Sequence, residues 1–494
     1  MNSLLPKIIN MQSIQIVVIG DFMLDEIALG DAERLSPDAP VPVFEMRSTQ
    51  SHAGGAGNVA KCMQAMGAHV TCLGVVGNDK GGETLLSLLS EDGLSMEHML
   101  KCDDRPTTVK RSFVGLAQHR HPQKMFRLDC ESNELLSKTQ NDQLLAALKD
   151  CLSSADVVCI EDYGKGVISE ENCQAIIQCC IQSGIEVIID PAGRTTYDLY
   201  SGATAITPNR TEAEKVTGQR LHDDEPIAGA VALAAKICDL LDLEAAILTL
   251  DKHGSVLKEK GREAIHLPTR ARDVYDVTGA GDMVLAAIAV GRAAKLDWLE
   301  CVEFANIAAG LEVELFGATP IPIENIQLAI LNEQADKSGK IRTLEELQLE
   351  ILALKQSGKK IILTNGCFDV IHAGHVSYLR EAATKGDVLI VGVNSDAQVN
   401  AQKGDGRPIY SLSERMEILA EFQCVSFVTS FIEPTAENLI KTIRPNLYVK
   451  GGDYSIEDIK EGILLEELKI PIELLAHRAG RSSTDTVTQM REQS

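Results

Sequence analysis

The sequence DVTGAGD (276–282) leads without interruption into the apolar stretch MVLAAIAVGRAA (283–294). Two glycines directly before an apolar helix let main-chain N–H groups converge on an anion, and the helix dipole reinforces the attraction. Asp282 at this junction is placed to accept a proton from a hydroxyl group that attacks a phosphoryl group. The alternative is an ordinary helix N-terminus with a glycine turn and an acidic residue in its first turn.

Strand-like and helix-like segments alternate on the N-terminal side of this stretch. Helical patterns such as NDQLLAALKDCL (141–152) lie between short apolar runs that are typical of buried parallel strands. This alternation predicts a doubly wound α/β domain. Two segments, 41–46 and 107–128, alternate differently and predict a small β-flap. The predicted parallel strands are residues 14–20, 157–161, 186–190 and 245–250.

A glycine loop, HAGGAGN (52–58), offers an amide and flexible backbone to sugar hydroxyls through Gly54, Gly55 and Asn58. The loop also contains the outline GxGxxA of a dinucleotide fingerprint. That fingerprint requires a strand directly before it. Here the strand-like VPVFEM ends several residues earlier, so we reject a dinucleotide site.

Two further segments of this half are candidates for nucleotide binding. TPNRTEAE places Asn209 and Glu212 one helical turn apart, an arrangement that can hold hydrated magnesium and phosphate. TLDKHG, from Thr249 to Gly254, follows a predicted strand and places a loop at the carboxyl edge of the sheet.

A second phosphate-handling pattern is GCFDVIHAGH (366–375), which follows the strand-like IILTNG and precedes a helical pattern. Two imidazoles three residues apart at a helix start, His372 and His375, can both point at one phosphate chain and stabilise charge as an α-phosphate is attacked. Zinc binding is the rival interpretation, but no third ligand lies at metal spacing nearby. Asp369 is expected to support the turn that holds the histidines.

Between these two halves the pattern loosens, with proline, glycine and mixed charge. We therefore predict a linker at 321–342 between domains at 1–320 and 343–494. The second domain carries four strand candidates separated by helices, which predicts a compact, Rossmann-like α/β fold.

The composition excludes several classes of protein. A net charge of −24 argues against a nucleic-acid surface. No apolar run approaches the roughly 20 residues of a membrane span, and the start lacks a signal-peptide pattern, so we expect a cytoplasmic protein. The thirteen scattered cysteines are expected to be reduced core thiols. One basic cluster, from Lys110 to Arg127, is either a solvated face or a phosphate contact.

With these motifs, residues 10–320 resemble the ribokinase, or pfkB, family of carbohydrate kinases. GGAGN matches the family's sugar motif, NRTE its N-x-x-E motif, and DVTGAGD its C-terminal signature. The resemblance implies a ribokinase-like fold with a β-flap and Asp282 as the catalytic base. It implies that Asp21 and Asn58 hold the sugar. The implied anion hole is Gly279, Ala280 and Gly281, and ATP is expected against residues 249–254 and Asn306.

Residues 343–494 resemble cytidylyltransferase-like nucleotidyltransferases, whose HxGH and RSST-like motifs flank the nucleotide phosphates. The match rests on LTNGCFD with HAGH, KGDGRP (403–408), VKGGDY (449–454) and RSST (481–484). The resemblance implies nucleotide contacts from these segments. They are Gly366, Phe368, Lys403, Arg407, Lys450, Asp453, Ser482, Ser483 and Thr484.

Both halves in this order resemble the bifunctional heptose 7-phosphate kinase and heptose 1-phosphate adenylyltransferase family, which makes ADP-heptose with ATP and Mg²⁺. RLSPDAPVPVFE (34–45) and EDYGKG (161–166) carry the heptose resemblance, whereas Ala192 stands where many such kinases have Lys. One alternative is a pfkB kinase fused to a cytidylyltransferase for another polyol or sugar phosphate. Another is a binding protein built from decayed enzyme domains, against which the intact motifs argue. The flap suggests a homodimer formed through the kinase half.

Overall fold

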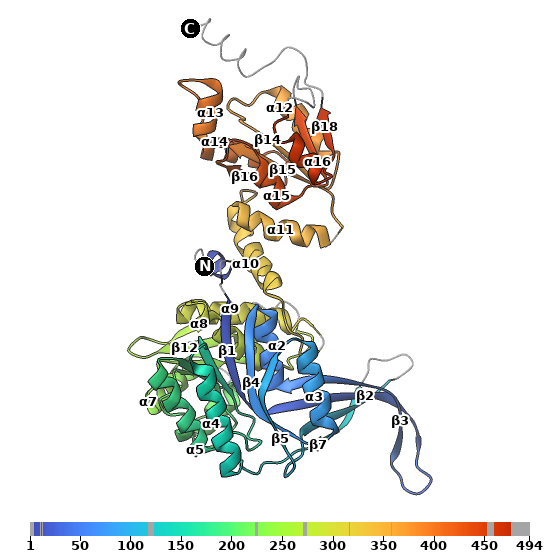
Figure 1. Cartoon of the computed structure of the whole chain (residues 1–494), viewed down its shortest axis with the longest axis vertical. Coiled ribbons are helices and arrows are strands. Elements are labelled where there is room, and N and C mark those ends of the chain that lie inside the picture. Colours follow the sequence, from blue (N-terminus) through green and yellow to red (C-terminus); the bar gives the residue numbers. More distant parts are fainter. Residues whose placement is uncertain are drawn as a thin grey trace, which may run out of the picture. The chain divides into compact units, whose positions relative to one another are not determined.

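The computed structural model describes residues 4–9, 11, 13–116, 123–222, 226–269, 274–315, 317–356, 358–451 and 459–475. The chain divides into two compact units, Met1–Ile326 and Gln327–Ser494, and Figure 1 labels many of their elements. None of the helices in the described ranges combines the length and apolarity that a membrane crossing requires. All thirteen cysteines are free thiols and most are buried, as expected from their apolar surroundings.

A nine-stranded sheet forms the centre of the first unit, in the order β13-β12-β11-β10-β9-β8-β1-β4-β5. The strands from β11 to β5 are parallel, and β12 and β13 add an antiparallel edge. The four predicted parallel strands are β1, β8, β9 and β11, each within one residue of its predicted limits. The strands are β1 Ile14–Gly20, β4 Ala68–Gly77, β5 Ser95–Cys102, β8 Val157–Glu161, β9 Glu186–Asp190, β10 Ala205–Ile206, β11 Ala245–Thr249, β12 Ser255–Glu259 and β13 Ile265–Leu267.

Helices cover both faces of this sheet, which confirms the predicted doubly wound architecture. Helices α2 and α8 pack on β1, and α8 also packs on β8 and β9; α4, α5 and α7 contact β4, β9 and β11 respectively. The central strands are apolar except near their ends because both faces are buried. The helices are α1 Leu4–Ile9, α2 Ala56–Ala65, α3 Lys80–Glu91, α4 Lys138–Leu152, α5 Glu170–Ser183, α6 Arg210–Thr217, α7 Pro226–Leu241, α8 Ala280–Ala293, α9 Trp298–Glu312 and α10 Ile323–Ser338.

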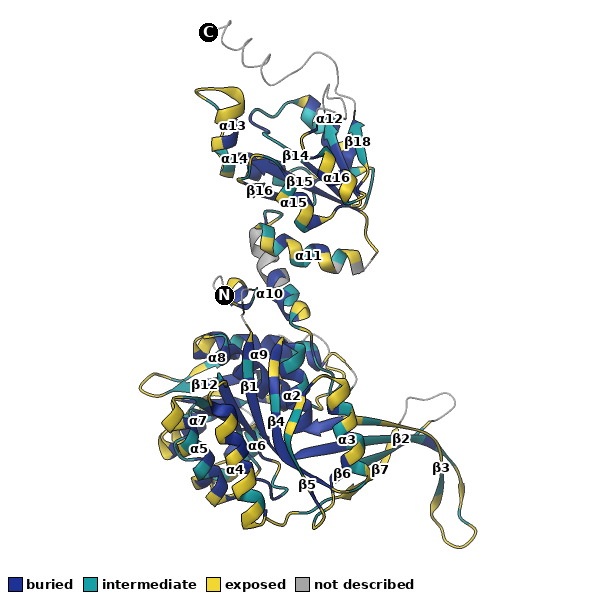
Figure 2. Ribbon diagram, viewed as in Figure 1, coloured by how far each residue is buried: buried dark blue, intermediate teal, exposed yellow. Residues whose placement is uncertain are grey.

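The predicted flap is a separate four-stranded sheet in the order β3-β2-β6-β7, and much of it is exposed (Figure 2). Its strands are β2 Phe22–Leu35, β3 Pro42–Gly55, β6 Thr108–Gly115 and β7 Gln123–Cys130. Strand β3 runs to Gly55, immediately before α2, so our inference that the strand ended near residue 46 is wrong. The polar residues 47–52 lack an apolar pattern because they pair with β2 away from the core. A dinucleotide unit remains excluded, since β3 is antiparallel to β2 and outside the parallel sheet.

The segment 321–342 contains α10, which begins after Pro322, a residue favoured at helix starts. The boundary between the two units lies inside this helix. The domain limits 1–320 and 343–494 remain a prediction.

The second unit contains a five-stranded parallel sheet in the order β16-β15-β14-β17-β18. One apolar cluster includes residues of α11, α15 and α16, and a second includes residues of α12 and α14. The strands are β14 Ile361–Gly366, β15 Val388–Asn394, β16 Phe427–Phe431, β17 Leu447–Gly451 and β18 Ile472–Leu475. The helices are α11 Leu344–Gln356, α12 Ala373–Ala383, α13 Asp396–Lys403, α14 Leu412–Ala420, α15 Glu437–Ile443 and α16 Gly462–Glu467.

Candidate active sites

Acidic side chains collect at the carboxyl ends of the parallel strands in the first unit. Asp21 follows β1, Glu161 ends β8, and Asp190 ends β9. Glu161 pairs in register with Gly20 on one side and Asp190 on the other, so these strand ends lie side by side. Open α/β sheets bind their ligands at this edge.

Asp282 is buried in the first turn of α8 and is held by two donors. The Asn58 side-chain amide donates to its Oδ2 at 2.7 Å, and the Tyr163 hydroxyl donates to its Oδ1 at 3.0 Å. Burial raises the pKa of Asp282 to about 6, although both hydrogen bonds act to lower it. A buried, oriented carboxylate with this pKa suits a general base that works near neutral pH.

The predicted anion hole lies directly before this carboxylate. Gly279 is the N-cap of α8 and has φ of 97°, a left-handed conformation that favours glycine. A Cβ atom at Gly279 would lie 2.6 Å from Glu312 Oε1 and 2.8 Å from Ala318 Cβ, so a side chain does not fit. A Cβ atom at Gly281 would meet nothing within 4 Å, which shows open space beside the helix start. Ala280, between them, is the first residue of α8.

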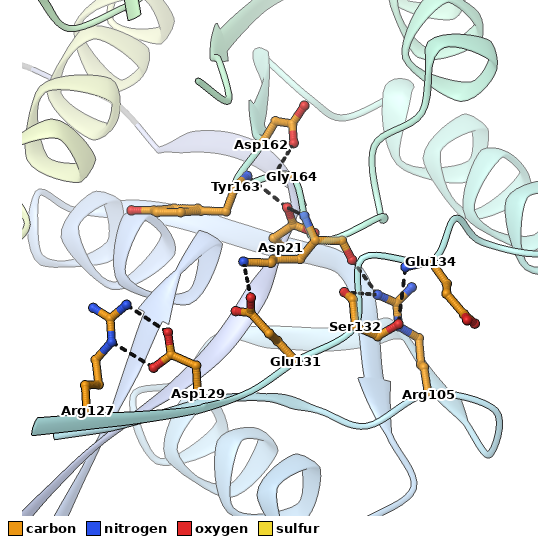
Figure 3. Close-up of polar contacts among 11 residues, drawn as sticks. Asp21, Arg105, Arg127, Asp129, Glu131, Ser132, Glu134, Asp162, Tyr163 and Gly164 are labelled. Atoms are coloured by element: carbon orange, nitrogen blue, oxygen red, sulfur yellow. Dashed lines mark hydrogen bonds and ion pairs between the residues drawn. The ribbon is translucent and has the colours of Figure 1, made fainter. Parts of the chain in front are cut away.

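Asp21 is also buried, and Tyr163, which contacts Asp282, contacts it as well (Figure 3). Its Oδ2 accepts hydrogen bonds from the main-chain N–H groups of Tyr163, at 2.8 Å, and Lys165, at 3.0 Å. Its Oδ1 has no hydrogen-bond partner among the described residues. Burial raises the pKa of Asp21 to about 6. A buried acceptor without a partner is suited to a ligand hydroxyl.

The sugar-motif glycines lie against this carboxylate's strand. Gly55 has φ of 54°, and a Cβ atom there would lie 2.5 Å from the main-chain oxygen of Asp21. A Cβ atom at Gly54 would lie 2.2 Å from Asp25 Oδ2. The structure thus brings Asp21, the two glycines and, through Asn58, the Asp282 carboxylate into one region.

Asn209 and Glu212 cap each other at the start of α6. The Asn209 side chain accepts from the Glu212 N–H at 3.0 Å, and Glu212 Oε2 accepts from the Asn209 N–H at 2.9 Å. This reciprocal pair is a capping box and accounts for both residues structurally. Burial raises the pKa of Glu212.

Three other predicted nucleotide contacts lie nearby along the sheet edge. Thr249 forms an isolated bridge with Asn209, and Gly254 follows a short 3-10 helix, Asp251–His253. Asn306 is buried: its Oδ1 accepts from the Ser255 hydroxyl at 2.9 Å and its amide donates to the Leu267 carbonyl at 3.3 Å. The structure therefore uses Asn306 to fix strands β12 and β13.

In the second unit, the HxGH pattern forms the start of α12, as the sequence predicts. His372 is the N-cap, and its Nδ1 accepts from the Gly374 N–H at 3.2 Å; His375 Nδ1 accepts from the His372 N–H at 3.4 Å. A neutral imidazole that accepts at Nδ1 carries its proton at Nε2. The two ring centroids lie 4.0 Å apart, so both rings present donors at one helix N-terminus.

A cavity of about 380 Å³ lies at the carboxyl end of β14 and is lined by His375 but not by His372. Lys450 is a cation in its wall, and its ammonium donates to the Asn365 carbonyl at 3.4 Å. Burial lowers the pKa of Lys450. The residues that line the cavity include the predicted Gly366, Phe368, His375 and Lys450, together with Asn365, Asn394, Thr435 and Glu461.

Arg407 does not line this cavity. It forms an ion pair with Asp369, whose side chain is fully buried, at 2.5 Å, and the Ile409 N–H donates to the same carboxylate at 2.6 Å. Asp369 thus ties the 404–409 loop to the turn before the histidines. Lys403, at the end of α13, is exposed and also outside the cavity wall.

Two family matches divide the chain. Residues 13–325 match the pfkB family of carbohydrate kinases, and residues 363–489 match the cytidylyltransferase-like family. The bifunctional protein HldE of Pelobacter propionicus is 38% identical over 476 residues, 96% of each chain. That of Sulfurimonas denitrificans is 37% identical over 486 residues, 98% of this chain and 99% of its own.

The chain belongs to the HldE family. It is a bifunctional enzyme of ADP-heptose biosynthesis, a carbohydrate kinase joined to an adenylyltransferase, as the family resemblance of its two halves implied. The alternative of a fusion for another polyol is not favoured. Its substrates are small molecules, and ATP-dependent enzymes of both classes generally use Mg²⁺.

Solved structures support the fold of the kinase half of this HldE family member. Arabidopsis thaliana ribokinase complexed with ribose and ATP is 21% identical and covers 64% of this chain and 99% of its own, with a TM-score of 0.50. Phosphofructokinase-2 from Escherichia coli in complex with potassium is 16% identical, with coverage of 64% and 98% and a TM-score of 0.54. The predicted ribokinase-like fold is confirmed.

Asp453 and the segment 482–484 lie outside the described residues. The sequence analysis gave Tyr163 no role, although this residue stands two positions after the predicted strand 157–161 and ligands bind at such strand ends. Among the described residues, no group of three His, Cys, Asp or Glu side chains is placed to hold a metal ion.

Proposed function

We propose that the first unit transfers the γ-phosphoryl group of ATP to O1 of D-glycero-β-D-manno-heptose 7-phosphate, with Asp282 as the base. The supporting observation is the buried Asp282 carboxylate, oriented by Asn58 and Tyr163 at a helix N-terminus. Asp282 takes the proton of the anomeric hydroxyl, O1 forms a bond to Pγ, and the bond from Pγ to the ADP oxygen breaks. The products are the 1,7-bisphosphate and ADP.

The other contacts divide between sugar and nucleotide. Asp21 accepts a hydrogen bond from a sugar hydroxyl at Oδ1, the oxygen that has no partner among the described residues. Gly54, Gly55 and Asn58 line the same region. The amides of Gly279, Ala280 and Gly281 hold the transferring phosphoryl group, since the space beside Gly281 is open. Thr249, Gly254 and Asn306 form the ATP edge.

Magnesium fits the sheet edge near Asn209 and Glu212 only through water, since these two side chains already cap each other. Mg²⁺ commonly keeps several waters and binds few protein carboxylates. When bound, it neutralises phosphate charge. Glu212 and Asn209 then accept hydrogen bonds from the waters that the magnesium ion keeps.

We propose that the second unit joins heptose 1-phosphate to the α-phosphate of ATP, giving ADP-heptose and pyrophosphate. The sugar phosphate is the nucleophile, and the Nε2–H groups of His372 and His375 stabilise the charge that develops on the α-phosphate. Lys450 supplies a cation in the cavity wall. Gly366 and Phe368 shape the same wall, while Lys403, Arg407, Asp453 and 482–484 remain predicted contacts to phosphates.

Because the first product carries two phosphates, a separate phosphatase must remove the 7-phosphate between the two steps. We also propose a homodimer through the outer face of the flap, where Phe126 and Leu128 are exposed by 51% and 54%. A molar mass equal to one chain in light scattering would contradict the dimer. The cytoplasmic location stays a prediction.

A coupled assay tests the proposed reactions. Full-length chain is incubated with ATP, Mg²⁺ and heptose 7-phosphate, and products are identified by mass spectrometry before and after a 7-phosphatase is added. A bisphosphate that then becomes ADP-heptose is expected. Consumption of other sugars with no phosphorylation of heptose 7-phosphate would overturn the substrate assignment.

The Asp282→Asn variant serves as an internal control in this assay. Removing a positioned base is expected to slow phosphorylation about 10²–10⁴-fold, while adenylyl transfer from added heptose 1-phosphate continues. Loss of both activities would contradict two independent sites.

A further inference from the structure

Glu312, the last residue of α9, is buried against the start of α8. A Cβ atom at Gly279, the N-cap of α8, would lie 2.6 Å from Glu312 Oε1, so the carboxyl group fills the place that a side chain at Gly279 would take. The Thr319 N–H group donates a hydrogen bond to the Glu312 carboxyl group. The Oε2 atom has no hydrogen-bond partner among the described residues, although it is buried. A buried carboxyl oxygen without a partner is costly in its charged form.

Main-chain hydrogen bonds hold the signature loop, residues 275–279, on the segment that carries Glu312. The N–H groups of Tyr275 and Asp276 donate to the Val313 carbonyl, at 2.7 and 3.2 Å. The Gly317 N–H donates to Asp276 Oδ2 at 3.2 Å. The end of α9 and the residues after it therefore support this loop. The Glu312 carboxyl group lies at the junction, against the first residue of the proposed anion hole.

The ionisable groups that interact with Glu312 are acids from three elements: Asp276 in the signature loop, Asp282 in α8 and the Cys62 thiol in α2. Burial and the charge of Asp282 raise the pKa of Glu312 to about 8. Burial also raises the pKa of the Cys62 thiol, which stays protonated. Burial opposes the ionisation of Asp276, but the hydrogen bonds that it accepts lower its pKa. Between about pH 6 and about 8, Asp276 and Asp282 are thus charged while Glu312 is neutral.

The charge of Glu312 matters because this residue contacts the helix start that we propose to hold the transferring phosphoryl group. The N–H groups and the dipole at the N-terminus of α8 attract an anion. A carboxylate against Gly279 would compete for that attraction and would repel a phosphate held by the same N–H groups. Burial strengthens this repulsion, because the effective dielectric constant is lower than in water. A neutral Glu312 leaves the N-terminus of α8 free to attract the ligand.

We propose that Glu312 supports the anion hole of the kinase site as a neutral carboxylic acid, and that its ionisation weakens the binding of the ATP phosphates. This inference rests on the proposed role of residues 279–281. The kinase reaction then requires two carboxyl groups in opposite states, with Asp282 ionised and Glu312 protonated. A rise in pH through about 8 therefore slows the kinase reaction. Adenylyl transfer takes place in the other unit and does not depend on Glu312.

The test measures the KM for ATP in the kinase reaction of the full-length chain, with saturating heptose 7-phosphate and Mg²⁺, at about pH 7 and about pH 9.5. These conditions lie on either side of the pKa of Glu312. In the wild-type chain the KM should rise about 10-fold or more between them, because the carboxylate repels the phosphates. In Glu312→Gln, which has the same shape but cannot ionise, this rise should be absent. Any effect of pH on ATP itself is common to both proteins. The KM for ATP in adenylyl transfer should be the same in both at each pH.

Glu314→Gln is the matched control, since it removes a carboxylate two residues further along the chain, where the side chain is exposed. This variant should keep the wild-type rise in KM. Glu312→Met is a second neutral variant, which should behave as Glu312→Gln does and replaces it if that protein is unstable.

Three results would overturn the inference about Glu312. They are a wild-type KM that does not rise with pH, an equal rise in the wild-type chain and the neutral variants, and a KM in the neutral variants that is already at the wild-type alkaline value at about pH 7. The last result would mean that the site needs the charge of Glu312. A wild-type chain that phosphorylates no heptose 7-phosphate at either pH would instead contradict the proposed function.

Discussion

Asn58 donates a 2.7 Å hydrogen bond to Asp282 although 224 residues separate them in the chain. The glycine loop at the start of α2 and the signature at the start of α8 are therefore parts of one site. The bond stabilises the ionised carboxylate and lowers its pKa, but burial has the larger effect and raises that pKa to about 6.

This relationship predicts a pH profile for the kinase reaction. Asp282 accepts a proton only when it is ionised, so kcat/KM should be high above pH 6 and fall as the pH drops through about 6. In Asn58→Ala the carboxylate loses a donor, its pKa rises, and the acid limb should move to higher pH. Burial also raises the pKa of Asp21 to about 6, so an acid limb near pH 6 in the wild-type enzyme could belong to either carboxylate. A shift of that limb in Asn58→Ala identifies Asp282, because Asn58 donates to Asp282. If the acid limbs of the wild-type enzyme and Asn58→Ala superimpose, the Asn58 hydrogen bond does not set the pKa of the catalytic group.

A second prediction concerns Tyr163, whose hydroxyl is the other donor to Asp282. Tyr163→Phe keeps the ring beneath Lys110 but removes this bond to a charged group, a loss of about 1.5–3 kcal/mol. The kinase kcat/KM should fall about 10- to 100-fold, with adenylyl transfer unaffected. Tyr197→Phe is the matched control, because the buried Tyr197 hydroxyl has no partner among the described residues. Equal losses in the two variants would mean that the Tyr163 hydroxyl has no special role.

The parallel core could be predicted from the sequence because its strands are buried on both faces and are therefore apolar except near their ends. Strand β2 and the middle of β3 could not, because they leave the core and carry polar residues on exposed surfaces. The positions of Asp282, His372 and His375 followed from local motifs at helix starts. The partners of Asp282 did not, since they depend on pairings across the whole domain. Arg407 shows the same limit: its loop suggested phosphate contact, yet its partner is a carboxylate 38 residues earlier.

The histidines of α12 allow structure and chemistry to be separated. His372→Ala removes both the N-cap and the imidazole, whereas His372→Asn keeps a good N-cap and removes only the imidazole. Both variants should lose adenylyl transfer about 10²–10³-fold. His372→Ala alone should destabilise the helix start, by about 1 kcal/mol. The kinase rate of the same preparations serves as the control. Full transferase activity in His372→Asn would reduce His372 to a capping residue.

The last prediction addresses the ion pair between Arg407 and Asp369. The Asp369 side chain is fully buried and that of Arg407 is 12% exposed, so Arg407→Met leaves a buried carboxylate with the Ile409 N–H as its remaining described donor. Removing one partner of a buried pair costs about 3–5 kcal/mol. The second unit should therefore unfold at a lower urea concentration, measured by incubating the full-length chain in a urea series without ATP and then assaying the initial adenylyltransferase activity that remains.

Lys359→Met gives the comparison for this variant. Lys359 pairs with Asp387 at 3.9 Å, and both side chains are about half exposed, so its loss should change the free energy of unfolding by less than about 1 kcal/mol. If Arg407 served only the triphosphate, Arg407→Met would slow adenylyl transfer in the absence of urea but leave the urea midpoint where Lys359→Met has it. A lowered midpoint in Arg407→Met alone would show that this residue holds the 404–409 loop on the histidine turn, because a contact made only with ATP cannot stabilise the unit without it.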